Sequence, residues 1–258
     1  MARDTQKKKY WQPLIMILLI LIIWQIACSL HIWTEYILPP PSKVWKSFSK
    51  MFLSGDLFVD IRISLKRVFI GFFIAFMLAF SLGMTASLKP SLSGYYNWFV
   101  QFMRNVPPLS LIALLILWFG IGETSKIIII VLASFFPMFL NIEKGFSQCD
   151  KKLIEVGASF HFSKREQFFR IILPNAIPDI LVGMRIGLGY SWRAIIGAEM
   201  IAASTGLGHM ILYAQQMSRS DKVIIGIIMI GLVGLICDKI FAVIISRLVK
   251  GDAENVWS

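Results

Sequence analysis

Apolar residues lie in long runs that alternate with short polar segments along nearly the whole chain. A helix needs about 20 mostly apolar residues to cross a bilayer, and runs of about this length recur throughout. The pattern therefore predicts an all-α polytopic membrane protein. Its six predicted transmembrane helices cover residues 13–31, 64–88, 99–119, 126–144, 177–201 and 223–247.

The composition agrees with this pattern. Hydrophobic residues make up 57% of the 258 residues and charged residues 16%, against about 25% charged residues in soluble proteins. Neither an internal repeat nor a low-complexity linker divides the chain. We expect a first part, residues 1–63, with a tail, the first span and an amphipathic outer segment in which residues 41–62 form a surface helix. Residues 64–250 form the membrane core and residues 251–258 a cytoplasmic tail.

The net charge of +11 reflects membrane topology. Lys and Arg collect in loops that stay in the cytoplasm, so we place the Lys-rich N-terminus and the basic segment 145–176 inside. The connection 120–125, which has no Lys or Arg, lies outside, and both termini come out cytoplasmic. Residues 32–63 then lie outside with four basic residues, against the usual bias. We expect no nucleic-acid partner, because no basic face with spaced aromatic residues is present.

The first apolar run is a retained span and not a cleaved signal. Residues 13–30 exceed the roughly 7–15 residues of a signal-peptide core, and no A-x-A-like site follows. The cysteines, Cys28, Cys149 and Cys237, are far apart and lack metal-ligand spacing, so neither a disulfide framework nor a zinc site is expected.

The longest polar segment lies between the fourth and fifth spans and contains EVGASFHFSKREQFFRIILPNAIP, residues 155–178. Leu153, Val156 and Phe160 recur at helical spacing, which predicts a short amphipathic helix. An apolar face in the cytoplasm must be covered. Either the protein's own spans cover it or a partner protein does.

A second short helix is predicted after this one. Ser163 with Glu166 three places on forms a capping-box pattern. Pro174 should end that helix, since proline does not continue a helix interior. Pro178 should then lie near the first turn of the fifth span.

This stretch resembles the cytoplasmic "EAA" loop of ABC importer permeases, which forms a coupling helix that docks on an ATPase subunit. Glu155 takes the Glu position and residues 172–174 give the apolar-Leu-Pro ending. The chain departs from the pattern where His161 replaces a glycine that serves a turn. The resemblance implies ATPase-coupling residues, which are Glu155, Val156, Gly157, Phe160, His161, Ser163, Leu173 and Pro174.

Four other segments, residues 37–45, 64–72, 102–123 and 183–208, resemble the nitrate/sulfonate/taurine-type branch of these permeases. The resemblance implies the type I ABC importer permease (MetI-like) fold in a bacterial inner membrane. It also implies a homodimer or paired permease, two ATPase subunits that bind ATP and Mg, and an extracytoplasmic binding protein. The expected cargo is a small anion, with a vitamin precursor or an aromatic acid as the alternative.

The chain itself lacks catalytic motifs. It has no phosphate-binding loop, and neither a Ser/His/Asp set nor an H-E-x-x-H motif is present. We therefore expect a non-catalytic transport subunit without a cofactor of its own. A stand-alone secondary transporter is the alternative from another class, but it usually shows two similar halves. A membrane scaffold would not need the loop with its Leu-Pro ending.

Four ionisable residues within or near spans are candidates for the translocation path: Arg104, Arg185, Arg193 and Glu199. Such residues are costly in lipid and usually face a bundle interior or a water path, and a positive lining suits an anion. Arg185 and Arg193 project about 80° apart on a helix and can share a broad face. Alternatively, Arg185 snorkels to the interface and Arg193 pairs with Glu199 or with a backbone carbonyl.

Glycines and prolines mark further features of the spans. Gly183, Gly187 and Gly189 are spaced for close helix packing. Gly206 and Gly208 should bend the chain at the outer end of the fifth span. A Pro-Pro pair at 107–108 should interrupt or kink the third span.

Overall fold

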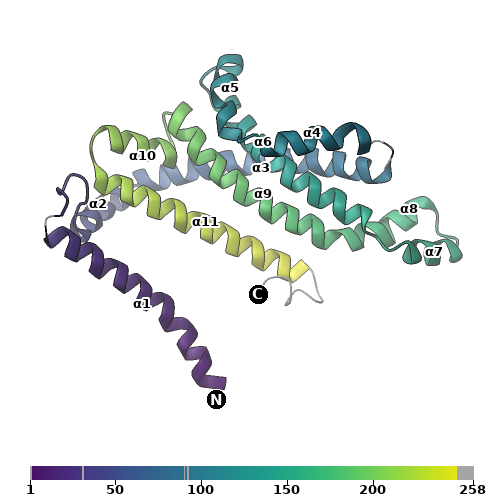
Figure 1. The fold of residues 1–258 in the computed structure, drawn as a ribbon, viewed down its shortest axis with the longest axis horizontal. Helices are drawn as coiled ribbons and strands as arrows, with labels where there is room; N and C mark the ends of the chain where they lie inside the picture. Colours follow the sequence, from purple (N-terminus) through teal and green to yellow (C-terminus); the bar gives the residue numbers. More distant parts are fainter. Residues whose placement is uncertain (1, 31, 90, 92, 249–258) are drawn as a thin grey trace.

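The computed structural model describes residues 2–30, 32–89, 91 and 93–248, and this part of the chain contains helices and no strand. The predicted tail 251–258 lies outside the described residues. Figure 1 shows the arrangement of the helices. The α-helices are α1 (Ala2–Ser29), α2 (Pro41–Ser54), α3 (Asp56–Leu88), α4 (Ser93–Asn105), α5 (Ile112–Phe119), α6 (Glu123–Ser147), α7 (Lys151–Ser159), α8 (Lys164–Gln167), α9 (Leu173–Ala202), α10 (Leu207–Gln216) and α11 (Ser220–Leu248).

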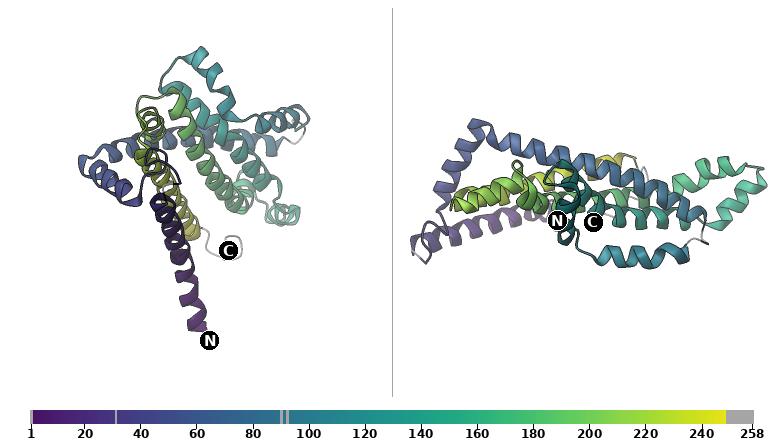
Figure 2. Two further views of the ribbon diagram at one scale, coloured as in Figure 1. Left: turned by 60° about the vertical axis from the view of Figure 1, so that its left-hand side comes forward. Right: turned by 90° about the horizontal axis from the view of Figure 1, so that it is seen from above.

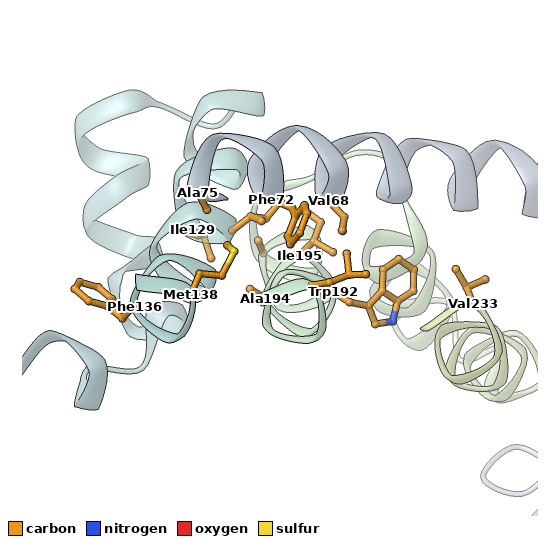
Figure 3. Close-up of a cluster of buried hydrophobic side chains, with 14 of the residues drawn as sticks. Val68, Phe72, Ala75, Ile129, Phe136, Met138, Trp192, Ala194, Ile195 and Val233 are labelled. Atoms are coloured by element: carbon orange, nitrogen blue, oxygen red, sulfur yellow. The ribbon is translucent and has the colours of Figure 1, made fainter. Parts of the chain in front are cut away.

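Helices α3, α6 and α9 pack side by side and form the core, and α11 lies along α9 (Figure 1). In contrast, α1 diverges from the other helices toward its N-terminus (Figure 2). Between the core helices, apolar side chains meet small residues, so the backbones approach closely. The buried cluster in Figure 3 includes Val68 and Phe72 of α3, Met138 of α6, Ile195 of α9 and Val233 of α11.

Four helices are long and apolar enough to cross a membrane: Asp56–Leu88, Glu123–Ser147, Lys164–Ala202 and Ser220–Arg247. They confirm the predicted spans 64–88, 126–144, 177–201 and 223–247, with longer ends. The predicted span 13–31 falls on α1, whose apolar part, Ile15–Ser29, is shorter than a full span.

The third predicted span is broken. The segments Gly94–Asn105 and Pro108–Phe119 meet at 88°, so a continuous helix over 99–119 is wrong and the predicted interruption is confirmed. Pro107 has an extended backbone, with ψ of 123°. Two successive prolines remove backbone donors and restrict the residue before them, which prevents α4 from continuing into α5.

The fifth span begins differently from the prediction. Pro174 does not end a helix, because α8 continues through the π turn η3 (Phe168–Ile172) directly into α9. The N–H of Leu173 bonds to the carbonyl of Phe168, five residues back. This wider turn places Pro174 in the first turn of α9, where the missing N–H is tolerated. Pro178 consequently lies inside α9 and not at its first turn.

The predicted surface helix over residues 41–62 is present but shorter than predicted. Helix α2 ends at Ser54, and Gly55 (φ 83°) turns the chain into α3 at once. The predicted 41–62 helix is therefore two elements, joined at a residue whose positive φ favours glycine.

Close packing is confirmed for two of the three predicted glycines of α9. A Cβ added at Gly183 would lie 2.9 Å from Asn141 Cβ, and one at Gly187 would lie 2.5 Å from Met138 Cγ. A Cβ at Gly189 would meet no atom within 4 Å, so the packing role predicted for Gly189 is wrong within this chain.

We predict that Gly187→Leu destabilises the fold by about 1–3 kcal/mol, because a leucine overpacks the α6–α9 contact. Gly189→Leu, on the same helix, serves as the matched control and should leave stability nearly unchanged. Thermal unfolding of both variants in detergent measures the difference. Equal losses in the two variants would contradict the packing described for α9.

Candidate functional site

The polar loop between α6 and α9 forms two helices joined by a tight bend, as predicted. Asp150 caps α7 by accepting the N–H of Lys152 at 2.9 Å. Ser163 and Glu166 form the predicted capping box at the start of α8, and the Ser163 N–H donates to Glu166 Oε2 at 3.0 Å. Local hydrogen bonds therefore fix both helix starts, of which the sequence pattern had indicated the second.

His161 occupies the bend with a left-handed backbone, φ 59°. This is the position where the resemblance expects glycine. A residue with a Cβ loses about 1–2 kcal/mol in this conformation relative to the right-handed one. The turn is made despite the histidine, because the N–H groups of His161 and Phe162 still bond to Ala158 and Gly157 carbonyls at 2.9 and 3.0 Å.

The apolar face of α7, formed by Leu153, Val156 and Phe160, lies open. These side chains are 47%, 52% and 71% exposed. The sequence left two alternatives for this face: the protein's own spans cover it, or a partner protein does. Among the described residues, the spans do not cover it. We call these three side chains the α7 face.

The other predicted coupling residues surround the α7 face without forming one surface with it. Glu155 is exposed, whereas Gly157 is buried, and a Cβ there would lie 2.5 Å from Ile171 Cδ1. Leu173 packs against the apolar core, and Pro174 is exposed at the start of α9. Leu173 and Gly157 therefore anchor the hairpin to the membrane helices.

A second site lies where the N-terminal parts of α3 and α6 meet the C-terminal end of α9. Glu199 of α9 is fully buried and Arg67 of α3 is 4% exposed. Arg67 Nη1 donates to Glu199 Oε1 at 2.7 Å, and Ser64 Oγ donates to Glu199 Oε2 at 2.8 Å. Glu199 therefore does not line a path in this chain, which corrects the prediction, and its partner is Arg67 and not Arg193.

The guanidinium of Arg67 bridges several segments at once. Its Nε and Nη2 donate to the two carboxylate oxygens of Glu123, at 2.8 and 2.7 Å, in the forked geometry that arginine favours. Its Nη1 also donates to the carbonyl of Thr205 at 2.8 Å. Lys126 Nζ donates to Glu123 at 2.7 Å. One residue thus ties α3 to α6, to α9 and to the connection that leads into α10.

Gly206 and Gly208 bend the chain over the Glu199 carboxylate, as the sequence predicted for this position. Gly206 has φ 108°, and a Cβ there would lie 2.4 Å from the Glu199 carboxyl. A Cβ at Gly208 would lie 2.3 Å from the Ile196 carbonyl oxygen. The N–H of Gly208 donates to Glu199 Oε2 at 3.0 Å. The glycines are required because the backbone approaches the carboxylate directly.

Sequence reasoning missed Arg67, although it lies in the predicted span 64–88 and in one of the segments that carry the family resemblance. The signal that could have indicated this ion pair was an arginine in one apolar run and a glutamate, Glu199, in another. An intramembrane ionisable residue calls for a partner. Spacing alone does not name that partner when 132 residues separate the two.

Two of the other predicted path residues, Arg185 and Arg193, line one cavity between α3, α9 and α11, whereas Arg104 lines another. Arg185 Nε and Nη2 donate to the carboxylate of Asp238 on α11 at 2.7 and 2.8 Å, so Arg185 is ion-paired and does not merely snorkel. The Arg193 guanidinium lies over the ring of Tyr190, 5.7 Å from its centre. Arg104 is exposed and lies at the wall of a cavity of about 250 Å³ between α4, α6 and α9.

The cysteines Cys28, Cys149 and Cys237 are free thiols. Burial raises the pKa of the Cys149 thiol, which keeps it protonated and unreactive. Among the described residues, no three His, Cys, Asp or Glu side chains lie close enough to hold a metal ion.

We predict that Glu199→Ala destabilises the protein by about 3–5 kcal/mol, because it leaves the Arg67 charge buried without that partner. Glu35→Ala is the control. It removes one carboxylate from the exposed Glu35–Lys43 pair and should change stability by less than about 1 kcal/mol. Unfolding by denaturant in detergent measures both. Similar losses in the two variants would contradict the role assigned to Glu199.

Comparison with known proteins agrees with this geometry. The family model described as binding-protein-dependent transport system inner membrane component matches residues 68–250. SsuC of Bacillus subtilis (strain 168), named as a permease protein for aliphatic sulfonates transport, is 36% identical over 246 residues, covering 95% of this chain and 89% of SsuC. TauC of Escherichia coli (strain K12), named as a taurine transport system permease protein, is 31% identical over 240 residues, covering 91% of this chain and 87% of TauC.

The crystal structure of an amino acid ABC transporter with histidines shares the fold at 17% identity, with a TM-score of 0.65 over 78% of this chain and 97% of that chain. The chain therefore belongs to the family of inner membrane components of binding-protein-dependent transport systems.

Proposed function

We propose that this chain is the permease subunit of an ATP-driven ABC importer in a bacterial plasma membrane. Its cargo is a small oxyanion of the sulfonate class, which a binding protein delivers from outside. The observation that carries the proposal is the exposed α7 face, which projects from the membrane helices. Membership of the family over residues 68–250 supports it.

The α7 face has the character of a docking surface for another protein. Phe160 projects from the end of a helix that is fixed by an N-cap and by a tight bend, so the surface is ordered before a partner arrives. Preformed aromatic anchors of this kind supply much of the affinity in protein interfaces. The partner is an ATPase subunit, which binds ATP and Mg because this chain has no phosphate-binding loop.

The helix directions support the orientation in the proposal. Helix α11 runs from the end of the molecule where α2 and α10 lie toward the side of α7 and α8, and the C-terminal end of α1 also lies near α2, with its N-terminal end apart from the other helices (Figure 1). With the basic loop 145–176 in the cytoplasm, both termini are cytoplasmic. Two copies of the chain, or one copy and a similar permease, form the translocation path.

The relatives guide the choice of substrate class. SsuC is named for aliphatic sulfonates and TauC for taurine, which is itself a sulfonate. We therefore favour a sulfonate over a vitamin precursor or an aromatic acid.

We predict that Phe160→Glu weakens binding of the cognate ATPase subunit at least about tenfold, because truncating or charging an aromatic interface anchor costs more than about 1.4 kcal/mol. Pull-down of the ATPase in detergent, over a range of ATPase concentrations, measures the change.

Tyr95→Glu is the matched control for this experiment. Tyr95 is also a highly exposed aromatic residue, and it lies on α4, a different helix from the one that carries the α7 face. It should bind the ATPase like the unmodified chain. If Phe160→Glu retains full binding, the ATPase docks elsewhere. If the unmodified chain binds no ATPase, the importer function itself is contradicted.

A further inference from the structure

One strip of α9 is only partly covered by the neighbouring helices. Ile186, Tyr190 and Arg193 are exposed and recur at helical spacing, with Gly189 between them. The remaining sides of α9 pack against α6, α3 and α11. We call these four residues the α9 strip.

The α9 strip belongs to a helix that is long and apolar enough to cross a membrane, and its Arg193 is too polar to face lipid. Arg193 is nine residues before the end of α9 at Ala202, which is about 14 Å, or close to half of the ~30 Å hydrocarbon core. A charged side chain at this depth is costly in lipid and usually faces water or protein. The α9 strip therefore lines a water-accessible space or an interface.

The charge of Arg193 is not compensated within the described residues. Arg67 is paired with Glu123 and Glu199, and Arg185 with Asp238. Arg193 contacts the face of Tyr190, and no carboxylate lies within ion-pair distance of it among the described residues. A positive charge of this kind, on a membrane-spanning helix and left without a counter-ion, favours an anion beside it.

There is room for such an anion. Arg193 and Gly189 line a cavity of about 400 Å³ between α3, α9 and α11, a size found for small-molecule sites. The Arg185–Asp238 ion pair lines the same cavity, and its two charges offset each other. Gly189 has no neighbour within 4 Å of an added Cβ, so the glycine keeps this space open. Trp192 forms a fixed wall, because its Nε1 donates to the Ile230 carbonyl at 3.1 Å.

We propose that Arg193 is a specificity-determining residue of the translocation path, which binds the sulfonate group of the substrate as it passes the α9 strip. Arg185 does not share this role, since Asp238 already neutralises it. The inference rests on the proposed function. A guanidinium suits the binding of a sulfonate group, because its planar fork donates two parallel hydrogen bonds to an oxyanion.

The test measures uptake of radiolabelled taurine, at a concentration below its KM, into proteoliposomes that contain the chain with its cognate ATPase and binding protein. Arg193→Gln should lower the uptake rate at least about tenfold, since hydrogen bonds to charged groups contribute about 1.5–3 kcal/mol. Arg193→Lys keeps the charge without the fork and should retain an intermediate rate. Arg62→Gln removes an exposed positive charge from the outer part of α3 and should transport like the unmodified chain.

Gly189→Leu tests the proposal without changing any charge. The leucine fills the space beside Arg193, so uptake should fall while the variant still binds the ATPase. This second variant decides the matter if Arg193→Gln does not fold, which loss of ATPase binding would reveal.

Three results would overturn the proposal: wild-type uptake by Arg193→Gln, equal losses in Arg193→Gln and Arg62→Gln, or wild-type uptake by Gly189→Leu. Failure of the proposed function looks different. In that case the unmodified chain shows no ATP-dependent taurine uptake, and the inference falls with it.

Discussion

The buried pairing of Arg67 with Glu199 is the constraint on which the rest of the structure depends. Two charges leave water for the interior only if hydrogen bonds satisfy both of them. Here Ser64, Glu123 and the Gly208 N–H complete the set. The N-terminal parts of α3 and α6 and the C-terminal end of α9 are fixed relative to one another as a result. Two glycines are needed after α9, because only they let the backbone close over the carboxylate.

The Arg67–Glu199 network and the α7–α8 hairpin are joined by one uninterrupted helix. Residues 164–202 run from α8 through the π turn into α9, a length of about 58 Å. A force applied to the hairpin is therefore carried along the helix that holds Arg193 at mid-depth and Glu199 at its far end. The importer mechanism we propose needs such an element, because the ATPase and the substrate meet the permease on opposite sides of the membrane.

Local and periodic features of this fold were predictable from the sequence. Hydropathy located four of the six predicted spans, and the spacing of Ser163 and Glu166 located a helix start. The spacing of Leu153, Val156 and Phe160 located the α7 face. Features set by tertiary contacts were not predictable. Pro174 looked like a helix end because a π turn leaves no mark in the residue pattern. Glu199 looked like a path residue because Arg67, its partner, lies on another span.

The most direct test of the account is the driving force for accumulation. Proteoliposomes that contain this chain and its cognate ATPase are given labelled taurine and the binding protein outside, and the ratio of internal to external taurine is followed. The account predicts accumulation above the external concentration only when ATP and the binding protein are both supplied. Accumulation driven by a sodium or proton gradient, with no ATPase present, would contradict it and would identify a secondary transporter.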